Sequence, residues 1–145
     1  QDIMRRPPRR PLEPIFTKQL VNDILFHGFI MSILTLGIFS LELYGFDSSL
    51  KKAQTMAFTT LVLVQLLHSF NCQNQQKSMF AAGPLTNPYL IFANCVSLFL
   101  LCLSIYMPPL SEAFELESLG ARDWIHAAAA SLLIIVSVEI QKWFR

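Results

Sequence analysis

The sequence predicts an all-α protein, a membrane four-helix module, and two observations carry that prediction. Of its 145 residues, 53% are hydrophobic and only 14% are charged, whereas soluble domains have about 45–50% apolar and about 25% charged residues. In addition, no Asp, Glu, Lys or Arg occurs in four long stretches, which are 24–41, 53–76, 78–111 and 124–138. A membrane-spanning helix needs about 20 mostly apolar residues, so each stretch has room for one crossing.

The first two spans are predicted over about 23–44 and 55–72. Asp23 and Glu42 lie near the ends of the first span, where charged side chains can reach the membrane surface. The second span is the weaker of the two, because Gln65 and His68 interrupt its apolar run. The four-span transmembrane domain therefore covers 23–145, and residues 1–22 form a basic, proline-rich cytoplasmic loop before it.

The third and fourth spans are predicted over about 89–107 and 124–143. Pro88 and Pro108 bracket the third span, at positions where helices tolerate proline best. Length alone would also allow the fourth to be a buried helix of a soluble bundle, but the unbroken apolar run of the third span conflicts with a soluble bundle. Aromatic residues at span edges favour the membrane interpretation; they are Tyr44, Tyr89, Tyr106, Trp124 and Trp143.

The basic residues predict the orientation of the spans. With four spans, both termini and the loop between the second and third spans lie on one side of the membrane. That side has eight Lys and Arg residues against three on the other. By the positive-inside rule both termini are cytoplasmic, whereas an odd number of spans would put Lys142 and Arg145 on the wrong side. We therefore expect a multi-pass integral membrane protein, in the plasma membrane if bacterial and in a secretory-pathway membrane if eukaryotic.

Several classes of function are excluded at this stage. A net charge of +1 gives no basic surface for nucleic acid. Three cysteines, an odd number without a C-x-x-C pair, indicate neither a disulfide framework nor a zinc site. No glycine-rich phosphate loop and no catalytic triad spacing are present. We therefore expect no catalytic residue and no cofactor in this chain.

The loop at the start is read in two ways. Its segment RRPPRRPLEP contains Arg5, Arg6, Arg9 and Arg10. Such arginine–proline clusters before a span are typical of a solvated cytoplasmic anchor, and the alternative is a polyproline ligand for an SH3-like partner.

Polar residues at membrane depth are the candidate functional residues, because they are costly there unless they face protein or water. Gln65 is the main one, with Thr59 and Thr60 before it and Ser69 one turn later on the same face. Their oxygens suit a hard cation; the alternative is a hydrogen bond between helices. Asn94 has the same two interpretations, and Glu139 is expected to pair with Lys142 at the membrane surface.

The three histidines fall in or near different spans. A metal site would need them to meet in the bundle, and the alternative is that each bonds to backbone or to a neighbouring helix.

Five strings, taken in order, resemble one family. They are DIMRRPPR, EPIF, QTMAFTTLVLVQLLHSFNC, IYMPPLSEAFELESLGARDW and VEIQKWFR. Together they are similar to the C-terminal transmembrane region of type II P-type cation-transporting ATPases, calcium pumps above all. The resemblance implies that the four spans are the seventh to tenth transmembrane helices, and that Asp2 to Lys18 is the cytoplasmic loop after the sixth.

The resemblance also implies what lies outside this chain. In the family, separate cytoplasmic domains bind ATP with Mg²⁺ and are phosphorylated at a DKTG sequence, and the first six helices carry most ion ligands. The implied partners are those parts, the lipid bilayer and a divalent cation. Without a DKTG sequence this chain alone holds no catalytic residue, so the ATPase activity belongs to the parent pump.

Gln65 aligns with a position where two-calcium pumps have a carboxylate ligand. A neutral glutamine favours a one-calcium pump or a calcium/manganese pump, with Gln65 at the edge of the ion site. Sodium pumps also resemble this region and have a glutamine there. However, the third span lacks the carboxylate that sodium pumps use, and the 45–54 loop is too short for their accessory subunit.

The resemblance implies a mechanical role as a support against which the ion-gating helices move. The loop with Arg5, Arg6, Arg9 and Arg10 would couple that movement to the phosphorylation domain. The alternative is an independent four-span protein that binds or regulates a partner. The chain begins with Gln1 in place of a methionine and opens in mid-motif at DIM, and we expect it to be a piece of a longer chain.

Overall fold

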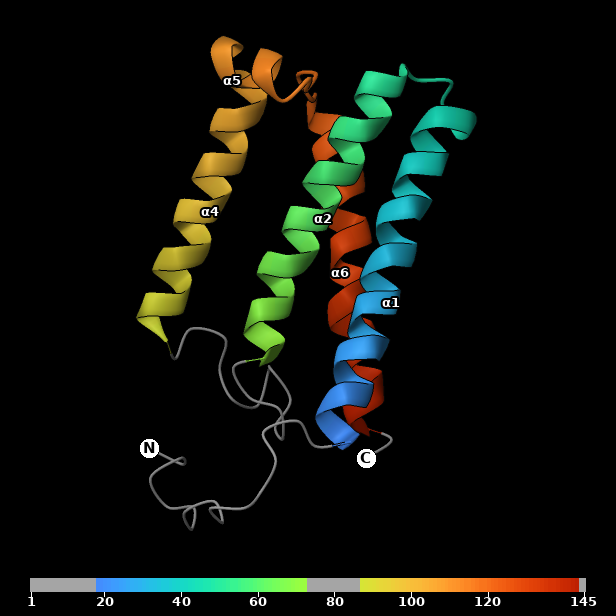
Figure 1. Ribbon diagram of the computed structural model, residues 1–145, viewed down its shortest axis with the longest axis vertical. Coiled ribbons are helices and arrows are strands. Elements are labelled where there is room, and N and C mark those ends of the chain that lie inside the picture. The colour runs from blue at the N-terminus through green and yellow to red at the C-terminus, as the bar shows by residue number, and fades with distance from the viewer. Residues whose placement is uncertain (1–17, 73–86, 144–145) are drawn as a thin grey trace.

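The computed structural model describes residues 18–72 and 87–143, and these residues are almost entirely helical (Figure 1). No strand occurs in these two ranges, so the all-α prediction is confirmed. The elements are α1 (Lys18–Ser40), the π-helical turn η2 (Leu41–Gly45), α2 (Leu50–Cys72), α4 (Pro88–Tyr106), the short α5 (Pro108–Ala113) and α6 (Ala121–Trp143).

Four of the helices are long and apolar enough to cross a membrane. Three of them begin earlier than the charge pattern predicts: α1 at Lys18 instead of 23, α2 at Leu50 instead of 55, and α6 at Ala121 instead of 124. Charged residues at a span edge are good helix formers, so the helix continues past the apolar segment. Residues 18–22 of the predicted loop lie in α1, and residues 1–17 lie outside the described ranges.

The helices run alternately up and down, so α1 and α4 begin at the end of the bundle where α2 and α6 finish (Figure 1). Helices α1, α2 and α6 pack against one another, and α4 stands beside α2. We call the end where α1 begins the basal end, and the end with η2 and α5 the distal end.

Helices α2 and α6 pack through buried apolar side chains, which include Met56 and Val64 of α2 and Ile134 of α6, and both helices also bury small residues. Ala53, Thr59 and Thr60 of α2 and Ala127 and Ser131 of α6 all have no exposed surface. In lipid, helices associate through close packing rather than through hydrophobic burial, and small side chains let the two backbones approach. Such residues suit close packing, and α2 and α6 form the most extensive contact between helices in the described part of the bundle.

Helix α4 has a clear start and is held at its distal end. The Asn87 side chain caps it by accepting hydrogen bonds from the backbone N–H groups of Tyr89 and Leu90, at 3.1 and 3.2 Å. At the other end, the Tyr106 hydroxyl donates to the Leu119 carbonyl at 2.8 Å and accepts from the Trp124 indole at 2.6 Å. The chain after α4 is thereby fastened to the start of α6.

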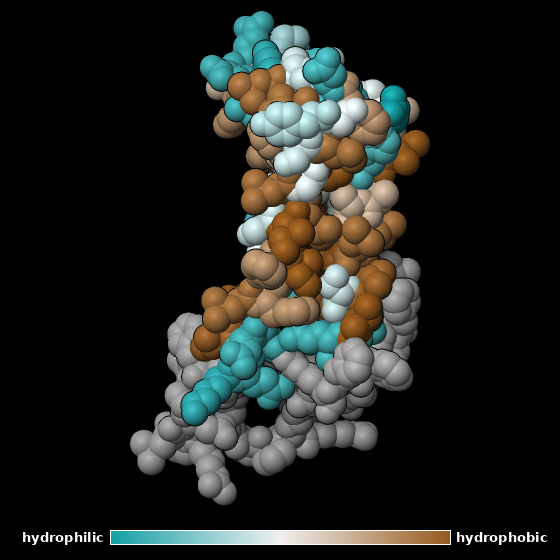
Figure 2. Space-filling view, turned by 90° about the vertical axis from the view of Figure 1, so that its right-hand side faces the viewer, coloured by the Kyte–Doolittle hydropathy of each residue, from teal (hydrophilic) through white to brown (hydrophobic). Residues whose placement is uncertain are grey.

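Apolar side chains cover much of the bundle's outer surface. Leu25 and Phe29 of α1 and Phe92 and Phe99 of α4 are each more than 60% exposed. Figure 2 shows hydrophobic residues over the middle of one face and hydrophilic residues toward the ends. This distribution suits helices surrounded by lipid or by further membrane helices.

Candidate functional site

Gln65 lies on the exposed side of α2. Beyond the first turn of α2, the exposed residues are Gln54, Phe58, Gln65 and Cys72, whose spacing of four and seven residues puts them on one face. We call this face the exposed stripe. No described side chain forms a hydrogen bond with Gln65, so its amide is available to a group outside the described part of the chain.

The structure separates Gln65 from the two threonines expected to act with it. Thr59 and Thr60 have no exposed surface, and their hydroxyls have no hydrogen-bond partner among the described residues. They belong to the buried side of α2, whereas Gln65 belongs to the exposed stripe. The described residues therefore form no common set of oxygens around Gln65.

Ser69, one turn after Gln65, meets Asn94 of α4 instead. The Asn94 amide nitrogen donates to the Ser69 hydroxyl oxygen at 3.0 Å, and the Ser69 hydroxyl lies 3.3 Å from the Asn94 amide oxygen. This contact joins α2 and α4 toward the basal end. Its geometry is that of a hydrogen bond between helices, one of the two roles expected for Asn94.

The other expected site residues are less fully described. Glu139 is half-buried on α6 near the basal end, and the side chain of Lys142, its expected partner, lies outside the description. The loop with Arg5, Arg6, Arg9 and Arg10 also lies outside the described residues.

A buried polar cluster at the distal end is not among the sequence predictions. Glu42, in the π-helical turn η2, is only 2% exposed. One of its carboxylate oxygens accepts from the Ser48 hydroxyl at 3.0 Å, and the other lies 3.6 Å from Nδ1 of His126 on α6. The sequence predicts Glu42 at the charged edge of a span and not in a buried cluster. The difference arises because a π-helical turn changes the direction in which the following side chains point.

The surroundings of this cluster hold both signs of charge. Lys52 forms an ion pair with Asp123 at 3.0 Å, and Asp123 also accepts from the Gly120 backbone N–H at 2.9 Å. The His126 ring stacks on Phe46 at 5.4 Å, and the Arg122 guanidinium lies 4.6 Å from the centre of the Phe46 ring. The cluster joins the distal ends of α1, α2 and α6, which is a structural role.

Two of the histidines meet at the basal end. The rings of His27 on α1 and His68 on α2 lie edge to face, with 4.6 Å between their centres. His27 also contacts Gln141 of α6, whose oxygen lies 2.7 Å from Nε2. Each of these histidines therefore interacts with a neighbouring helix, and no group of three or more metal-ligating side chains occurs among the described residues.

Comparison with known proteins places these features in a family. Residues 1–144 match the family model described as "Cation transporting ATPase, C-terminus". The chain is similar to the "Calcium-transporting ATPase" of Bacillus subtilis (strain 168), 37% identical over 124 residues, which are 86% of this chain and 14% of that protein. It is also similar to "Calcium-transporting ATPase 1" of Bacillus cereus, 33% identical over 97% of this chain and 18% of the relative.

A human protein gives a further match. "Calcium-transporting ATPase type 2C member 2" of Homo sapiens is 30% identical over 142 residues, which are 98% of this chain and 15% of that protein. The chain thus spans less than a fifth of the length of these relatives.

Proposed function

Because this chain belongs to the family of C-terminal regions of cation-transporting ATPases, and is accordingly a multi-pass membrane protein, we propose that it supports an ATP-driven calcium pump. The observation that carries the proposal is the match over nearly the whole chain to this family, together with relatives named as calcium-transporting ATPases. In the proposed pump, ATP and Mg²⁺ act in domains outside this chain.

The packing of the bundle supports a static role for this module. A buried apolar cluster that includes Val64 of α2 and Ile134 of α6, with Met31 of α1 packed against it, joins these three helices, and the polar cluster around Glu42 joins them at the distal end. A support of this kind gives moving helices a fixed surface to slide or tilt against. In the proposed pump, those moving helices are the preceding ones, and the cytoplasmic side is the basal end.

The experiment is calcium transport by the full-length natural protein that contains this chain. Membrane vesicles with that protein should take up calcium only when Mg·ATP is supplied, and an ionophore should release it. Manganese should compete if the pump transports both ions. Absence of ATP-dependent uptake of either ion would overturn the proposal. A stop codon and a start site directly before Gln1 would instead favour an independent four-span protein.

We further propose that Gln65 lies at the edge of the ion path. Its support is the exposed stripe, because an amide at membrane depth is costly unless it faces protein or water. A single neutral oxygen makes a weak ligand for a hard cation, so the expected contribution is small. A weak contribution of this kind suits a one-calcium pump or a calcium/manganese pump.

The test of Gln65 uses a matched pair of variants in the full-length protein. Gln65→Leu should raise the calcium concentration for half-maximal uptake several-fold, because a ligand or its water contact is lost. Gln54→Leu makes the same change on the same stripe near the distal end and should leave that concentration unchanged. Equal calcium affinity in both variants would make Gln65 a packing residue and leave the pump proposal intact.

A further inference from the structure

Two buried atoms at the distal end face each other without a hydrogen bond. They are one carboxylate oxygen of Glu42, in η2, and Nδ1 of His126, on α6, and 3.6 Å separates them. Neither atom has a hydrogen-bond partner among the described residues, and the Glu42 residue is only 2% exposed. A buried carboxylate oxygen without a partner is costly, so a positive charge on the facing ring would stabilise this arrangement.

The connections at the distal end all belong to the described part of the chain. The undescribed stretches join it at Lys18, Cys72, Asn87 and Trp143, and these four residues are at the basal end (Figure 1). The two distal connections, between α1 and α2 and between α4 and α6, are described without a gap. The groups of this chain that face the pair can therefore be named.

The charged groups around the pair leave Glu42 without a permanent counter-charge. Those that line the cavity beside it are Lys52 of α2 and Arg122 and Asp123 of α6, and α1 has no charged residue near this end. Lys52 pairs with Asp123 at 3.0 Å, and the Arg122 guanidinium lies 4.6 Å from the centre of an aromatic ring. Among the described residues, no Lys or Arg forms an ion pair with Glu42, which leaves His126 as its source of positive charge.

Water reaches the other side of the His126 ring. The side chain of His126 is 28% exposed. The cavity beside the pair has a volume of about 170 Å³, far more than the 10–15 Å³ or so that one water molecule needs. Nδ1 is the ring nitrogen that is buried without a partner, whereas Nε2 is not buried in this way. A proton can therefore arrive at Nε2 from the aqueous compartment at the distal end, and nothing has to reach the buried atoms.

The ring of His126 is held between the two elements. It stacks on the Phe46 ring, with 5.4 Å between the ring centres and 9° between the planes. Phe46 directly follows η2, and its backbone N–H donates to the Leu41 carbonyl at 3.0 Å. Because His126 touches Phe46 and faces Glu42, a change in its charge acts on the contact between η2 and α6.

The two protonation states of His126 differ in their effect on Glu42. In the neutral ring with its hydrogen on Nδ1, an uncharged N–H faces the carboxylate. When Nε2 takes a proton from water, the ring becomes a cation, and the same Nδ1–H carries part of its charge. Charge-assisted hydrogen bonds are roughly twice as strong as neutral ones and are shorter, at about 2.7–2.9 Å. The charged pair therefore draws η2 and α6 together.

We propose that Glu42 and His126 form a proton-operated latch between η2 and α6. Acid in the distal compartment closes the latch by protonating Nε2 of His126, and the loss of that proton to water releases it. The latch is built from this chain's own residues and goes beyond the proposed transport function, so it holds whether or not the parent protein moves calcium.

The experiment is hydrogen exchange of the full-length protein in nanodiscs, read by mass spectrometry over residues 44–49. The amides of Phe46 and Ser48 in this segment bond to carbonyls of η2, so their exchange reports opening of the latch. At each pH the natural protein is compared with His126→Gln, because the intrinsic exchange rates of these amides are then equal. Most histidines in water are charged at about pH 5.5 and neutral at about pH 8. The variant should exchange at least about fivefold faster at the lower pH and within about twofold at the higher pH.

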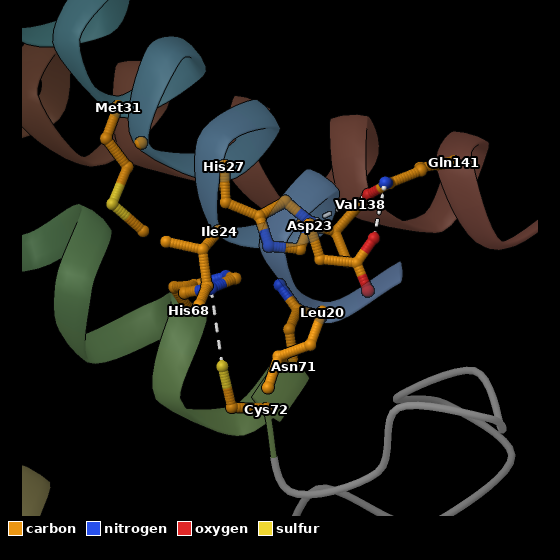
Figure 3. A pocket seen from close by; sticks show the side chains of 11 residues that line it. Leu20, Asp23, Ile24, His27, Met31, His68, Asn71, Cys72, Val138 and Gln141 are labelled. Atoms are coloured by element: carbon orange, nitrogen blue, oxygen red, sulfur yellow. Dashed lines mark hydrogen bonds between the residues drawn. The ribbon is translucent and has the colours of Figure 1, made fainter. Parts of the chain in front are cut away.

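His27→Gln is the matched control, because it makes the same change on α1 at the basal end, where His27 lies beside His68 (Figure 3). It should leave the exchange of residues 44–49 unchanged at both pH values. A ring that acts only by packing on Phe46 would give His126→Gln the same effect at both pH values, and that result would overturn the proposal.

The partner of His126 is tested in a Glu42→Gln background. Glutamine keeps the size of the side chain but has no charge, so adding His126→Gln should now change exchange by the same factor at both pH values. A pH dependence that persists without the Glu42 charge would assign the effect to another carboxylate, such as Asp123, and overturn the latch.

A second comparison covers the case in which His126→Gln does not fold. Glu42→Gln alone should speed the exchange of residues 44–49 at least about threefold more at the lower pH than at the higher pH, because only the charged ring loses an ionic partner. An equal effect at both pH values would contradict the proposal.

Discussion

At the scale of single residues, Asn94 shows how one polar side chain can orient a whole helix. Helix α4 buries few side chains, and Leu101 and Ile105, its buried residues, both lie toward the distal end. Toward the basal end, the hydrogen bond between Asn94 and Ser69 connects α4 to α2 in place of buried side chains. Such bonds between helices in membranes contribute on average about 0.6 kcal/mol.

The first prediction is a measurable coupling between these two residues. In a double-mutant cycle with Ser69→Ala and Asn94→Ala, the free energies of unfolding in detergent should show a coupling of about 0.6 kcal/mol, and no more than about 1.7. The control cycle pairs Asn94→Ala with Ser104→Ala, because the Ser104 hydroxyl bonds only within α4, to the Leu100 carbonyl. That cycle should give no coupling, and a similar value in both cycles would contradict the assignment.

The sequence identifies Gln65 and Asn94 as candidate functional residues, but it does not predict which groups their side chains contact. Both are amides in an apolar helix, and the period of a helix says which residues share a face, not which face is covered. The structure gives Asn94 a partner on α2 and leaves Gln65 on the exposed stripe. Asn71 is buried at the end of α2, and nothing in the helical period singles it out.

At the scale of elements, the π-helical turn η2 has the largest effect. It ends the first span with a wider turn, and Glu42 within it is buried beside Ser48 and His126. The Phe46 backbone N–H then closes the turn on the Leu41 carbonyl at 3.0 Å. Ser48 donates to one carboxylate oxygen of Glu42, whereas the other has no hydrogen-bond partner among the described residues and lies 3.6 Å from His126 Nδ1. Because an unsatisfied buried carboxylate is costly, this contact makes η2 sensitive to the position of the start of α6.

The second prediction concerns Glu42. Glu42→Ala should lower the free energy of unfolding by about 2–4 kcal/mol, because it leaves a cavity and removes the acceptor of the Ser48 hydroxyl. Glu42→Gln keeps the size and one acceptor oxygen and should cost about 1 kcal/mol. Thermal unfolding in detergent measures both, with the exposed Glu115 changed to Ala and Gln as the control. Equal losses for both Glu42 variants would mean that the negative charge matters more than the shape.

The elements themselves were largely predictable, and their ends were not. A stretch without charged residues indicates the apolar part of a span, so the sequence predicts the position of the middle of each long helix. Lys52, Arg122 and Asp123 interrupt the apolar pattern but continue the helices at the distal surface, where Lys52 pairs with Asp123 and Arg122 lies over the Phe46 ring. The sequence does not predict helix α5, because Pro108 is expected at the end of the third span, although proline also suits the first turn of a helix.

At the scale of the whole molecule, the alternating helices place Lys18 and Glu112 at opposite ends of the bundle. The third prediction is that these ends face the cytoplasm and the opposite compartment, respectively. In a protein whose Cys72, Cys95 and Cys102 are replaced by serine, a maleimide that cannot cross membranes should react with Lys18→Cys in inside-out vesicles. It should react with Glu112→Cys in right-side-out vesicles, and the reverse pattern would contradict the predicted orientation.

The fourth prediction concerns the coupling loop, which lies outside the described residues. Reversing the charge of Arg5 and Arg9 to glutamate in the full-length protein should lower the calcium transported per ATP, if this loop connects the support to the phosphorylation domain. Lys51→Glu reverses an exposed charge at the distal end and serves as the control. Unchanged transport per ATP in the arginine variant would rule out coupling through these residues.

The bond between the Trp124 indole and the Tyr106 hydroxyl gives this molecule a native optical probe. The sequence contains two tryptophans, so replacing Trp143 by phenylalanine leaves a single fluorophore at the junction of α4 and α6. Its emission depends on whether the indole N–H keeps its protein partner or meets water. The fluorescence of Trp124 would thus follow the position of α4 during a transport cycle, without an attached dye.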